Sequence, residues 1–310
     1  MKVTIYILTY KHFENLYDAI KSVLNQDYSC IQLIVSDDGS PDFPKDEVIN
    51  FIELHKKDNI VDYTVLANKK NVGTVRHINN LLKIATGDIY VPLAGDDLFY
   101  SNDVINKIVE CYHRTKFKVL TTSRIKYGIN GEVLGCMPFC TSRAIIKKKM
   151  GTASQQHKMF TESKMYDFAS GSAMAYEANF LKEMGFFDER FVLWEDGPFI
   201  NKMTSKGYAL TLGYDIVAIK YRDGGVSSGG NPLLQNDMFL FNETDRWINS
   251  DSYGFFHKRV LECIKRKYLV KNVWQRILLR ICFFDVFLDR MLYINSMKWA
   301  ERKDSKYLKL

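Results

Sequence analysis

Residues 89–97 read IYVPLAGDD, a short apolar run that ends in two adjacent acids. Two stretches nearer the N-terminus have the same form, VTIYILTY at 3–10 and IQLIVSDDGS at 31–40. Between these runs, apolar residues recur at the spacing of one helix face, as in 16–24. This alternation of strand and helix predicts an α/β fold with a mostly parallel sheet flanked by helices.

The polar residues that end the apolar runs define the predicted binding edge. In a mostly parallel sheet, ligands bind beyond the carboxyl ends of the strands. Three clusters follow predicted strands: Thr9-Tyr10, Asp37-Asp38 and Asp96-Asp97. Although these clusters are far apart in the sequence, we expect them to lie on one rim of the sheet.

The second half of the chain is less regular. Further elements are expected as helices over 103–115 and 177–184 and as strands over 119–122 and 208–221. The segment RAIIKKKMGTASQQ at 143–156 is basic and weakly periodic, so it is predicted to be a mobile loop.

The excess positive charge of the chain lies near its C-terminus. Residues 255–310 contain 14 Lys and Arg against 5 Asp and Glu, although the whole chain has a net charge of only +7. The Gly/Ser-rich stretch 224–230 separates this region from the body, so residues 226–310 are predicted to be a linker and a basic amphipathic helical tail. Such a composition favours helices at a membrane surface. A lid packed on the body, or an oligomer interface, is the alternative.

The overall composition narrows the class of protein. The chain has 310 residues, of which 46% are hydrophobic and 25% charged, as in folded globular proteins. It has no run of 18 uncharged apolar residues and no secretory leader, so a cytoplasmic location is expected. Walker, GxGxxG and GxSxG motifs are absent, which leaves P-loop ATP hydrolysis, dinucleotide redox chemistry and acyl transfer without support.

The acids at the predicted rim have both a chemical and a structural interpretation. Asp96 and Asp97 offer the oxygen ligands that suit Mg²⁺ or Mn²⁺ beside a substrate diphosphate, or they form a solvated turn. In the Asp37-Asp38 pair, one carboxylate could accept from a base or ribose, or the pair forms an Asx turn. Tyr10 could stack on that base, or it is a half-buried core aromatic.

A third acidic pair stands in the sequence Trp194-Glu195-Asp196-Gly197-Pro198. Trp194 would shield the carboxylates from water and raise their proton affinity toward that of a useful base. The structural alternative is that Asp196 caps a helix that Pro198 opens.

In this order, the motifs resemble those of the inverting glycosyltransferases of family 2, which have the GT-A fold. The motifs that carry the resemblance are TY at 9–10, VSDDGS at 35–40, NVGTVRHIN at 71–79, LAGDD at 93–97 and WED at 194–196. GFFDE at 185–189 and YR at 221–222 resemble two further family motifs.

The resemblance implies a GT-A catalytic domain over residues 1–225, with nucleotide-sugar binding in 1–100 and the acceptor side in 120–225, followed by a C-terminal helical extension. By position, the family's donor-binding residues correspond to Thr9, Tyr10, Asp37, Asp38, Gly73 and Asp96. Its metal site corresponds to Asp96 and Asp97, and its catalytic centre to Glu195 and Asp196, with Asp196 as general base. Its acceptor side corresponds to Ser170, Gly171, Ser172 and Trp194.

The chain departs from the family's pattern at three places. Ala94 stands where the family's metal-binding motif has its first acid. His77-Ile78-Asn79 replaces a frequent ARN, and Asp223-Gly224 stands where a His often follows YR. Metal binding would therefore depend on Asp96 and Asp97.

The resemblance implies transfer of a sugar from a nucleotide sugar, with UDP expected as the nucleotide, to a hydroxyl of a glycan acceptor, with Mn²⁺ or Mg²⁺ as cofactor. A lipid-diphosphate-linked acceptor in bacterial polysaccharide assembly, such as O-antigen or capsule, would place the protein at the inner face of the cytoplasmic membrane, which residues 255–310 would contact. The tail could also support a homo-oligomer.

Two rival classes are weighed against this expectation. A sugar-phosphate nucleotidyltransferase would carry a Gly-rich basic loop after the first strand, and residues 9–13 contain no glycine. A non-enzymatic basic protein could bind nucleic acid or a membrane through the tail, but the body is nearly neutral and has no recognised nucleic-acid module. Nucleic acid is therefore not expected as a partner.

Overall fold

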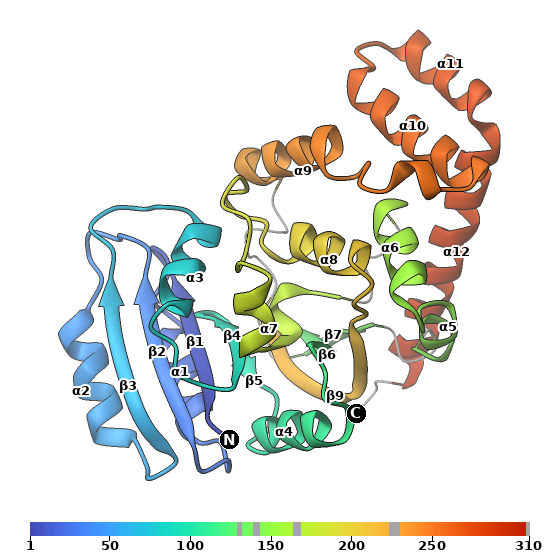
Figure 1. Cartoon of the computed structure of the whole chain (residues 1–310). Helices are drawn as coiled ribbons and strands as arrows, with labels where there is room; N and C mark the ends of the chain where they lie inside the picture. The colour runs from blue at the N-terminus through green and yellow to red at the C-terminus, as the bar shows by residue number, and fades with distance from the viewer. Residues whose placement is uncertain (129–131, 139–142, 164–168, 223–229, 308–310) are drawn as a thin grey trace.

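The computed structural model describes the chain except residues 129–131, 139–142, 164–168, 223–229 and 308–310 (Figure 1). The N-terminal part alternates strand and helix as predicted. Its elements are β1 (Val3–Thr9), α1 (Leu16–Leu24), β2 (Ile31–Asp37), α2 (Lys45–His55), β3 (Ile60–Ala67), α3 (Thr74–Leu82) and β4 (Ile89–Ala94). β1 and β2 are buried on both faces, because helices cover each side of the sheet.

The second part of the chain extends this sheet and adds helices. Its strands are β5 (Leu98–Phe99), β6 (Val119–Tyr127), β7 (Val133–Met137), β8 (Met174–Glu177) and β9 (Thr211–Arg222). Its helices are α4 (Val104–Thr115), α5 (Arg143–Lys149), α6 (Ala153–Thr161), α7 (Ala178–Glu183) and α8 (Asp196–Ser205), with a 3₁₀ turn at Gly171–Ala173.

One nine-stranded sheet runs through both parts in the order β3-β2-β1-β4-β8-β6-β9-β5, and β7 pairs with β6. β1, β2, β3 and β4 are parallel, as are β6 and β9, whereas β8 is antiparallel to both of its neighbours. The predicted mostly parallel sheet flanked by helices is confirmed. Thr9 lies opposite Asp37 in the β1–β2 register, and Gly95 N donates to Leu8 O, so three polar clusters do share one rim.

The prediction of a mobile loop over 143–156 is wrong, because most of this segment is helical. α5 buries Ile146, and Met150 after it is buried too, while the lysines of α5 face solvent. α6 begins at a capping box: Thr152 Oγ1 accepts from Gln155 N, and Gln155 Oε1 accepts from Thr152 N. The T-x-x-Q spacing was a helix-start signal that the weak periodicity concealed.

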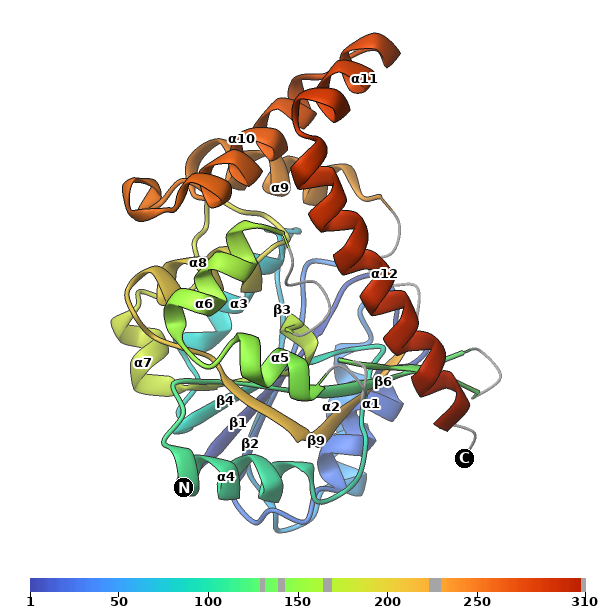
Figure 2. The ribbon, with the colours of Figure 1, turned by 90° about the vertical axis from the view of Figure 1, so that its right-hand side faces the viewer.

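The C-terminal region is helical, as predicted. It consists of α9 (Pro232–Thr244), a 3₁₀ turn at Ser250–Ser252, α10 (Phe255–Leu269), α11 (Val273–Cys282) and α12 (Phe284–Tyr307). α10, α11 and α12 share a small apolar core, and Figures 1 and 2 show α10 and α11 projecting away from the sheet while α12 returns along it to β7. None of the helices within the described residues has the length and hydrophobicity that crossing a membrane requires.

The Gly/Ser-rich stretch 224–230, where the domain boundary is predicted, lies outside the described residues except for Gly230. Asp223 and Gly224, which stand where the family often has a His after YR, also lie outside the described residues. The division of the chain into 1–225 and 226–310 therefore stays a prediction.

Candidate active site

The acids after β2 are occupied by hydrogen bonds from their own chain. Asp37 is completely buried, and its carboxylate accepts from Ser40 N at 2.5 Å and from Ser40 Oγ at 2.6 Å. This is the Asx-type turn that the sequence offered as the structural alternative. Nearby, Thr9 Oγ1 donates to His12 O at 3.1 Å, and the Tyr10 ring is left partly open to solvent, with 39% of the residue exposed.

Asp38 closes a loop over the rim. Its Oδ1 accepts from Asn68 Nδ2 at 2.8 Å and from Val72 N at 3.0 Å, and its Oδ2 accepts from Gly73 N at 3.0 Å. Gly73 has a φ of +88°, and a Cβ there would stand 2.7 Å from Val192 Cγ1. Asp38 therefore anchors the segment that leads into α3, and Gly73 allows that segment to touch residue 192.

The acids after β4 have a different environment. Asp97 is 1% exposed, and its Oδ1 accepts from Arg222 N at 3.1 Å. Within the described part of the chain, its Oδ2 is buried without a hydrogen-bond partner. Burial, together with a smaller contribution from the neighbouring charge of Asp96, raises the pKa of Asp97 to about 7. Asp96 itself is partly exposed.

Glu195 and Asp196 lie at the start of α8, against the 3₁₀ turn that precedes β8. Asp196 Oδ2 accepts from Gly171 N at 2.7 Å, and its Oδ1 accepts from Gly197 N at 2.7 Å. A Cβ on Gly171 would lie 2.6 Å from Glu195 Oε1, so a larger residue there would require the two carboxylates to shift. Burial raises the pKa of Asp196, and burial together with the Asp196 charge raises the pKa of Glu195 to about 8.

Arg124, on β6, connects the two acid pairs and was missed by the sequence analysis. Its guanidinium lies 4.2 Å from the centre of the Tyr221 ring and donates to Ser172 Oγ at 3.3 Å. Its positive charge lowers the pKa of both Asp97 and Asp196. A single arginine in the middle of a strand has no motif around it, so no local signal marked it.

The predicted site residues therefore fall on two sides of one region. The donor-side residues lie at the ends of β1 and β2, in the turns that follow, and just before α3, and they comprise Thr9, Tyr10, Asp37, Asp38 and Gly73. The other side holds Ser170, Gly171, Ser172, Trp194, Glu195 and Asp196. Two observations bring the sides together. Gly73 touches Val192, and burial of Tyr6 in β1 raises its pKa with an added contribution from the charge of Glu195.

The pattern of the chain matches known proteins. The family described as "Glycosyl transferase family 2" matches residues 4–169. A GalNAc(5)-diNAcBac-PP-undecaprenol beta-1,3-glucosyltransferase from Campylobacter jejuni is 36% identical over 96 residues, which are 31% of this chain and 30% of that protein. An uncharacterized glycosyltransferase from Rickettsia conorii is 32% identical over 103 residues, or 33% of this chain and 16% of that one. The matched region thus spans less than a third of each of these relatives.

Solved structures share the fold. S. aureus TarS 1–349 in complex with UDP-GlcNAc superposes with a TM-score of 0.61 at 17% identity, over 84% of this chain and 70% of that one. The mannosyltransferase PcManGT from Pyrobaculum calidifontis, in complex with GDP-Man and Mn²⁺, superposes with a TM-score of 0.54 at 14% identity. The superposition covers 98% of this chain and 86% of that one. The family match covers more than half of the chain, and this protein belongs to glycosyl transferase family 2.

Proposed function

We propose that this protein transfers a sugar from a nucleotide-sugar donor to a hydroxyl group of a glycan acceptor, with inversion at the anomeric carbon. The observation that carries the proposal is the partly buried Glu195-Asp196 pair, whose pKa values are both raised, in a chain that belongs to glycosyl transferase family 2. A carboxylate with raised proton affinity is suited to accept a proton near neutral pH.

Asp196 is the proposed general base. The backbone N–H groups of Gly171 and Gly197 hold one bond to each of its oxygens, which fixes the carboxylate while leaving lone pairs free. It removes the proton from the acceptor hydroxyl as that oxygen attacks the anomeric carbon from the face opposite the nucleotide. The bond from the anomeric carbon to the diphosphate oxygen breaks, and the nucleoside diphosphate leaves. Glu195 helps to keep the proton affinity of the pair high.

Asp96 and Asp97 fit a divalent cation and would hold Mn²⁺ or Mg²⁺. The buried Oδ2 of Asp97 is an unpaired acceptor among the described residues, and Asp96 beside it is partly exposed. Two carboxylates are a small ligand set, which suits a cation that completes its shell with water and diphosphate oxygens. When bound, such a cation neutralises the charge that develops on the leaving diphosphate.

UDP is the proposed nucleotide, supported by the fold that the chain shares with TarS, whose structure contains UDP-GlcNAc. The half-exposed Tyr10 ring would stack on the uracil, and Asp38 would accept from the base with the lone pairs that its three chain donors leave free. Thr9, Asp37 and Gly73 would shape this donor side. Ser170 to Ser172 and Trp194 would line the acceptor side.

We further propose a lipid-diphosphate-linked acceptor of bacterial polysaccharide assembly and a peripheral position on the inner face of the cytoplasmic membrane. The Campylobacter jejuni relative is named for an undecaprenol-linked acceptor. The tail supports the membrane contact: α11 exposes Val273, Trp274, Ile277, Leu278 and Ile281 on one face. Arg276 and Arg280 flank this face, and each basic residue near anionic lipid contributes about 1 kcal/mol.

The transfer proposal is tested by a donor screen with Mn²⁺, a lipid-linked acceptor panel and the Asp196→Asn variant. We expect release of free UDP with the wild-type protein and a loss of about 10²- to 10⁴-fold with Asp196→Asn, while UDP affinity measured by calorimetry is unchanged. Asp215→Asn, which removes an exposed carboxylate on β9, is the matched control. Turnover near the wild-type rate in Asp196→Asn would falsify the base assignment.

The membrane contact is tested by flotation of the full chain with vesicles of anionic or zwitterionic lipid. Trp274→Ser combined with Ile281→Ser is expected to abolish flotation with anionic vesicles, because both side chains lie on the exposed face of α11. Leu54→Ser, an equally exposed apolar residue on α2, is the control. A wild-type protein that stays with the unbound fraction and forms dimers through α11 would show an oligomer interface instead.

A further inference from the structure

A buried carboxylate from the C-terminal region grips the loop that leads to the proposed base. Asp237, on α9, is 3% exposed. Its Oδ1 accepts from Val192 N at 3.0 Å, and its Oδ2 accepts from Val192 N at 2.9 Å, from Leu193 N at 2.6 Å and from Trp194 N at 3.1 Å. Three consecutive backbone N–H groups therefore point at one side chain.

This arrangement favours a negatively charged acceptor. Successive backbone N–H groups form a concavity that binds anions, and here the chain fills it with its own carboxylate. Charged acceptors form the stronger hydrogen bonds to backbone N–H groups. Oδ2 accepts from all three N–H groups, so an amide at this position could keep its oxygen there, but its bonds would be weaker and its NH2 group would lie against Val192 N.

The loop of residues 192–194, which Asp237 holds, connects the donor side of the site to α8. Val192 O accepts from Val75 N at the start of α3, and Val192 Cγ1 lies against Gly73. On the other side, the Trp194 ring packs on Phe241 of α9 with a centroid distance of 5.3 Å. Glu195 and Asp196 follow at once in the sequence. Any movement of residues 192–194 is thus transmitted directly to the two acids.

We propose that Asp237 is a positioning residue of the transfer reaction: it fixes the backbone of residues 192–194 and thereby the orientation of Asp196. The proposal rests on the proposed role of Asp196 as the base. It also places α9, which lies beyond the region matched by the family, within the catalytic unit.

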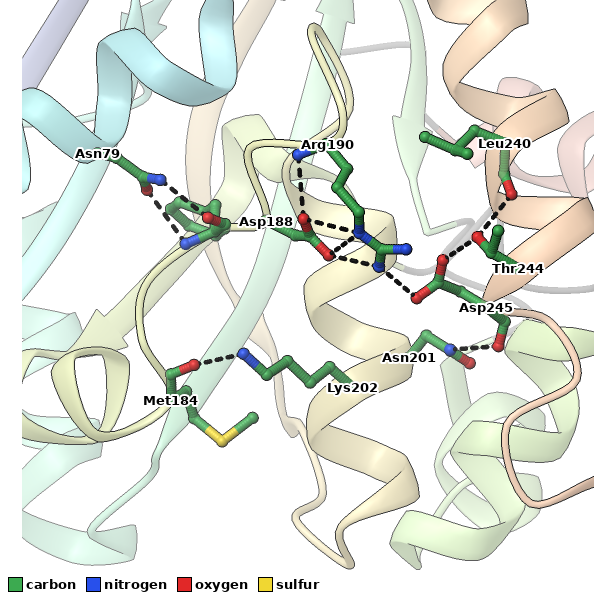
Figure 3. Close-up of polar contacts among 10 residues, drawn as sticks. Asn79, Met184, Asp188, Arg190, Asn201, Lys202, Leu240, Thr244 and Asp245 are labelled. Atoms are coloured by element: carbon green, nitrogen blue, oxygen red, sulfur yellow. Dashed lines mark hydrogen bonds and ion pairs between the residues drawn. The ribbon is translucent and has the colours of Figure 1, made fainter.

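A second contact between α9 and the same part of the chain offers a matched control. Figure 3 shows Arg190 between Asp188 and Asp245, with Arg190 Nη2 at 2.6 Å and 2.8 Å from the two carboxylates. Asp245 O also accepts from Asn201 Nδ2 of α8 at 3.0 Å. Asp245 therefore ties the end of α9 to the body without contacting residues 192–194. Its loss would affect stability but leave the orientation of Asp196 intact.

The test compares Asp237→Asn, Asp237→Glu and Asp245→Asn for kcat, donor KM, thermal unfolding and hydrogen exchange in the peptide that contains residues 191–196. For Asp237→Asn we expect kcat to fall by about 10²-fold, because small misplacements of a catalytic group have effects of this size, with donor KM unchanged and faster exchange at 192–194. Asp237→Glu, which keeps the charge, should recover part of kcat. Asp245→Asn should lower the unfolding temperature while kcat stays at the wild-type value.

Equal kcat values in Asp237→Asn and Asp245→Asn would overturn the proposal, as would wild-type exchange rates at 192–194 in Asp237→Asn. If Asp237→Asn does not fold, Asp237→Glu provides the test. A wild-type kcat in that variant, together with faster hydrogen exchange at residues 192–194, would show that the loop can move without affecting the reaction and would overturn the proposal. Hydrogen exchange needs no substrate. A wild-type protein that transfers no sugar would therefore refute the proposed function separately, while the exchange data still report whether Asp237 holds the loop.

Discussion

The acid pairs after β2 and after β4 look alike in the sequence but differ in the folded protein. Asp37 and Asp38 accept five hydrogen bonds from Ser40, Asn68, Val72 and Gly73. Asp97 accepts one from a described residue, has a buried unpaired oxygen and a raised pKa, and lies beside the partly exposed Asp96. A buried acid that accepts mostly from its own chain mainly holds a loop in place, with little capacity left for a ligand, whereas one that is left short of donors is more fully available to a ligand.

The largest effect that would sharpen this contrast is expected from Asp97→Asn. Loss of the carboxylate removes half of the proposed cation site, and metal-ion stabilisation contributes several kcal/mol, so transfer should fall by at least about 10²-fold. The unfolding temperature should not fall, because a neutral amide is easier to bury than a charge. Transfer rates with and without Mn²⁺ measure the effect. A wild-type response to Mn²⁺ would contradict the assignment.

Asp38→Ala is expected to act mainly through the loop of residues 68–73. Three donors would lose their acceptor, and each buried unpaired group costs about 1–3 kcal/mol, part of which water entering the loop would offset. Urea denaturation should show a lower free energy of unfolding, accompanied by weaker UDP binding. If binding alone weakened while stability held, Asp38 would be purely a ligand group and the contrast would fail.

Arg124→Gln is expected to shift the pH dependence of transfer. The Arg124 charge lowers the pKa of Asp196, so its removal raises that pKa, and the base becomes protonated at a higher pH. The acidic limb of kcat/KM against pH should therefore move to higher pH, by up to about one unit. Arg114→Gln, at an exposed position on α4, is the control. A shift toward lower pH would show that Arg124 does not act on the base.

The smallest effect is expected from Glu195→Gln on stability. The pKa of Glu195 is raised to about 8, so its stabilising contribution is complete below its ordinary range and is lost as pH rises through 8. A glutamine does not ionise, so the variant does not lose this stability as the pH rises. The variant should therefore unfold at a higher temperature than the wild type near pH 9 and at a similar temperature near pH 4, as calorimetry can measure. If the variant and the wild type unfolded at the same temperature at both pH values, the folded protein would not raise the pKa of Glu195.

Much of the fold could be predicted because its signals are local. The runs at 3–10, 31–40 and 89–97 have strand composition, and 16–24 has helical spacing. Parallel pairing then brings their ends to one rim. α5 and α6 were missed because basic residues interrupt the apolar spacing and the capping signal at Thr152 is short. β8 was missed because it consists of four residues that pair with strands distant in the sequence.

The family, the strand–helix alternation and the positions of the acidic pairs can be predicted from the sequence, because each depends on residues close together in the chain. Which acids accept hydrogen bonds from their own chain follows from the folded structure, since the donors come from loops that fold back from elsewhere. It alone also brought in Arg124 and Asp237. Each acts on Asp196 or on the loop before it from another element, and a contact of that kind leaves no pattern in the surrounding sequence.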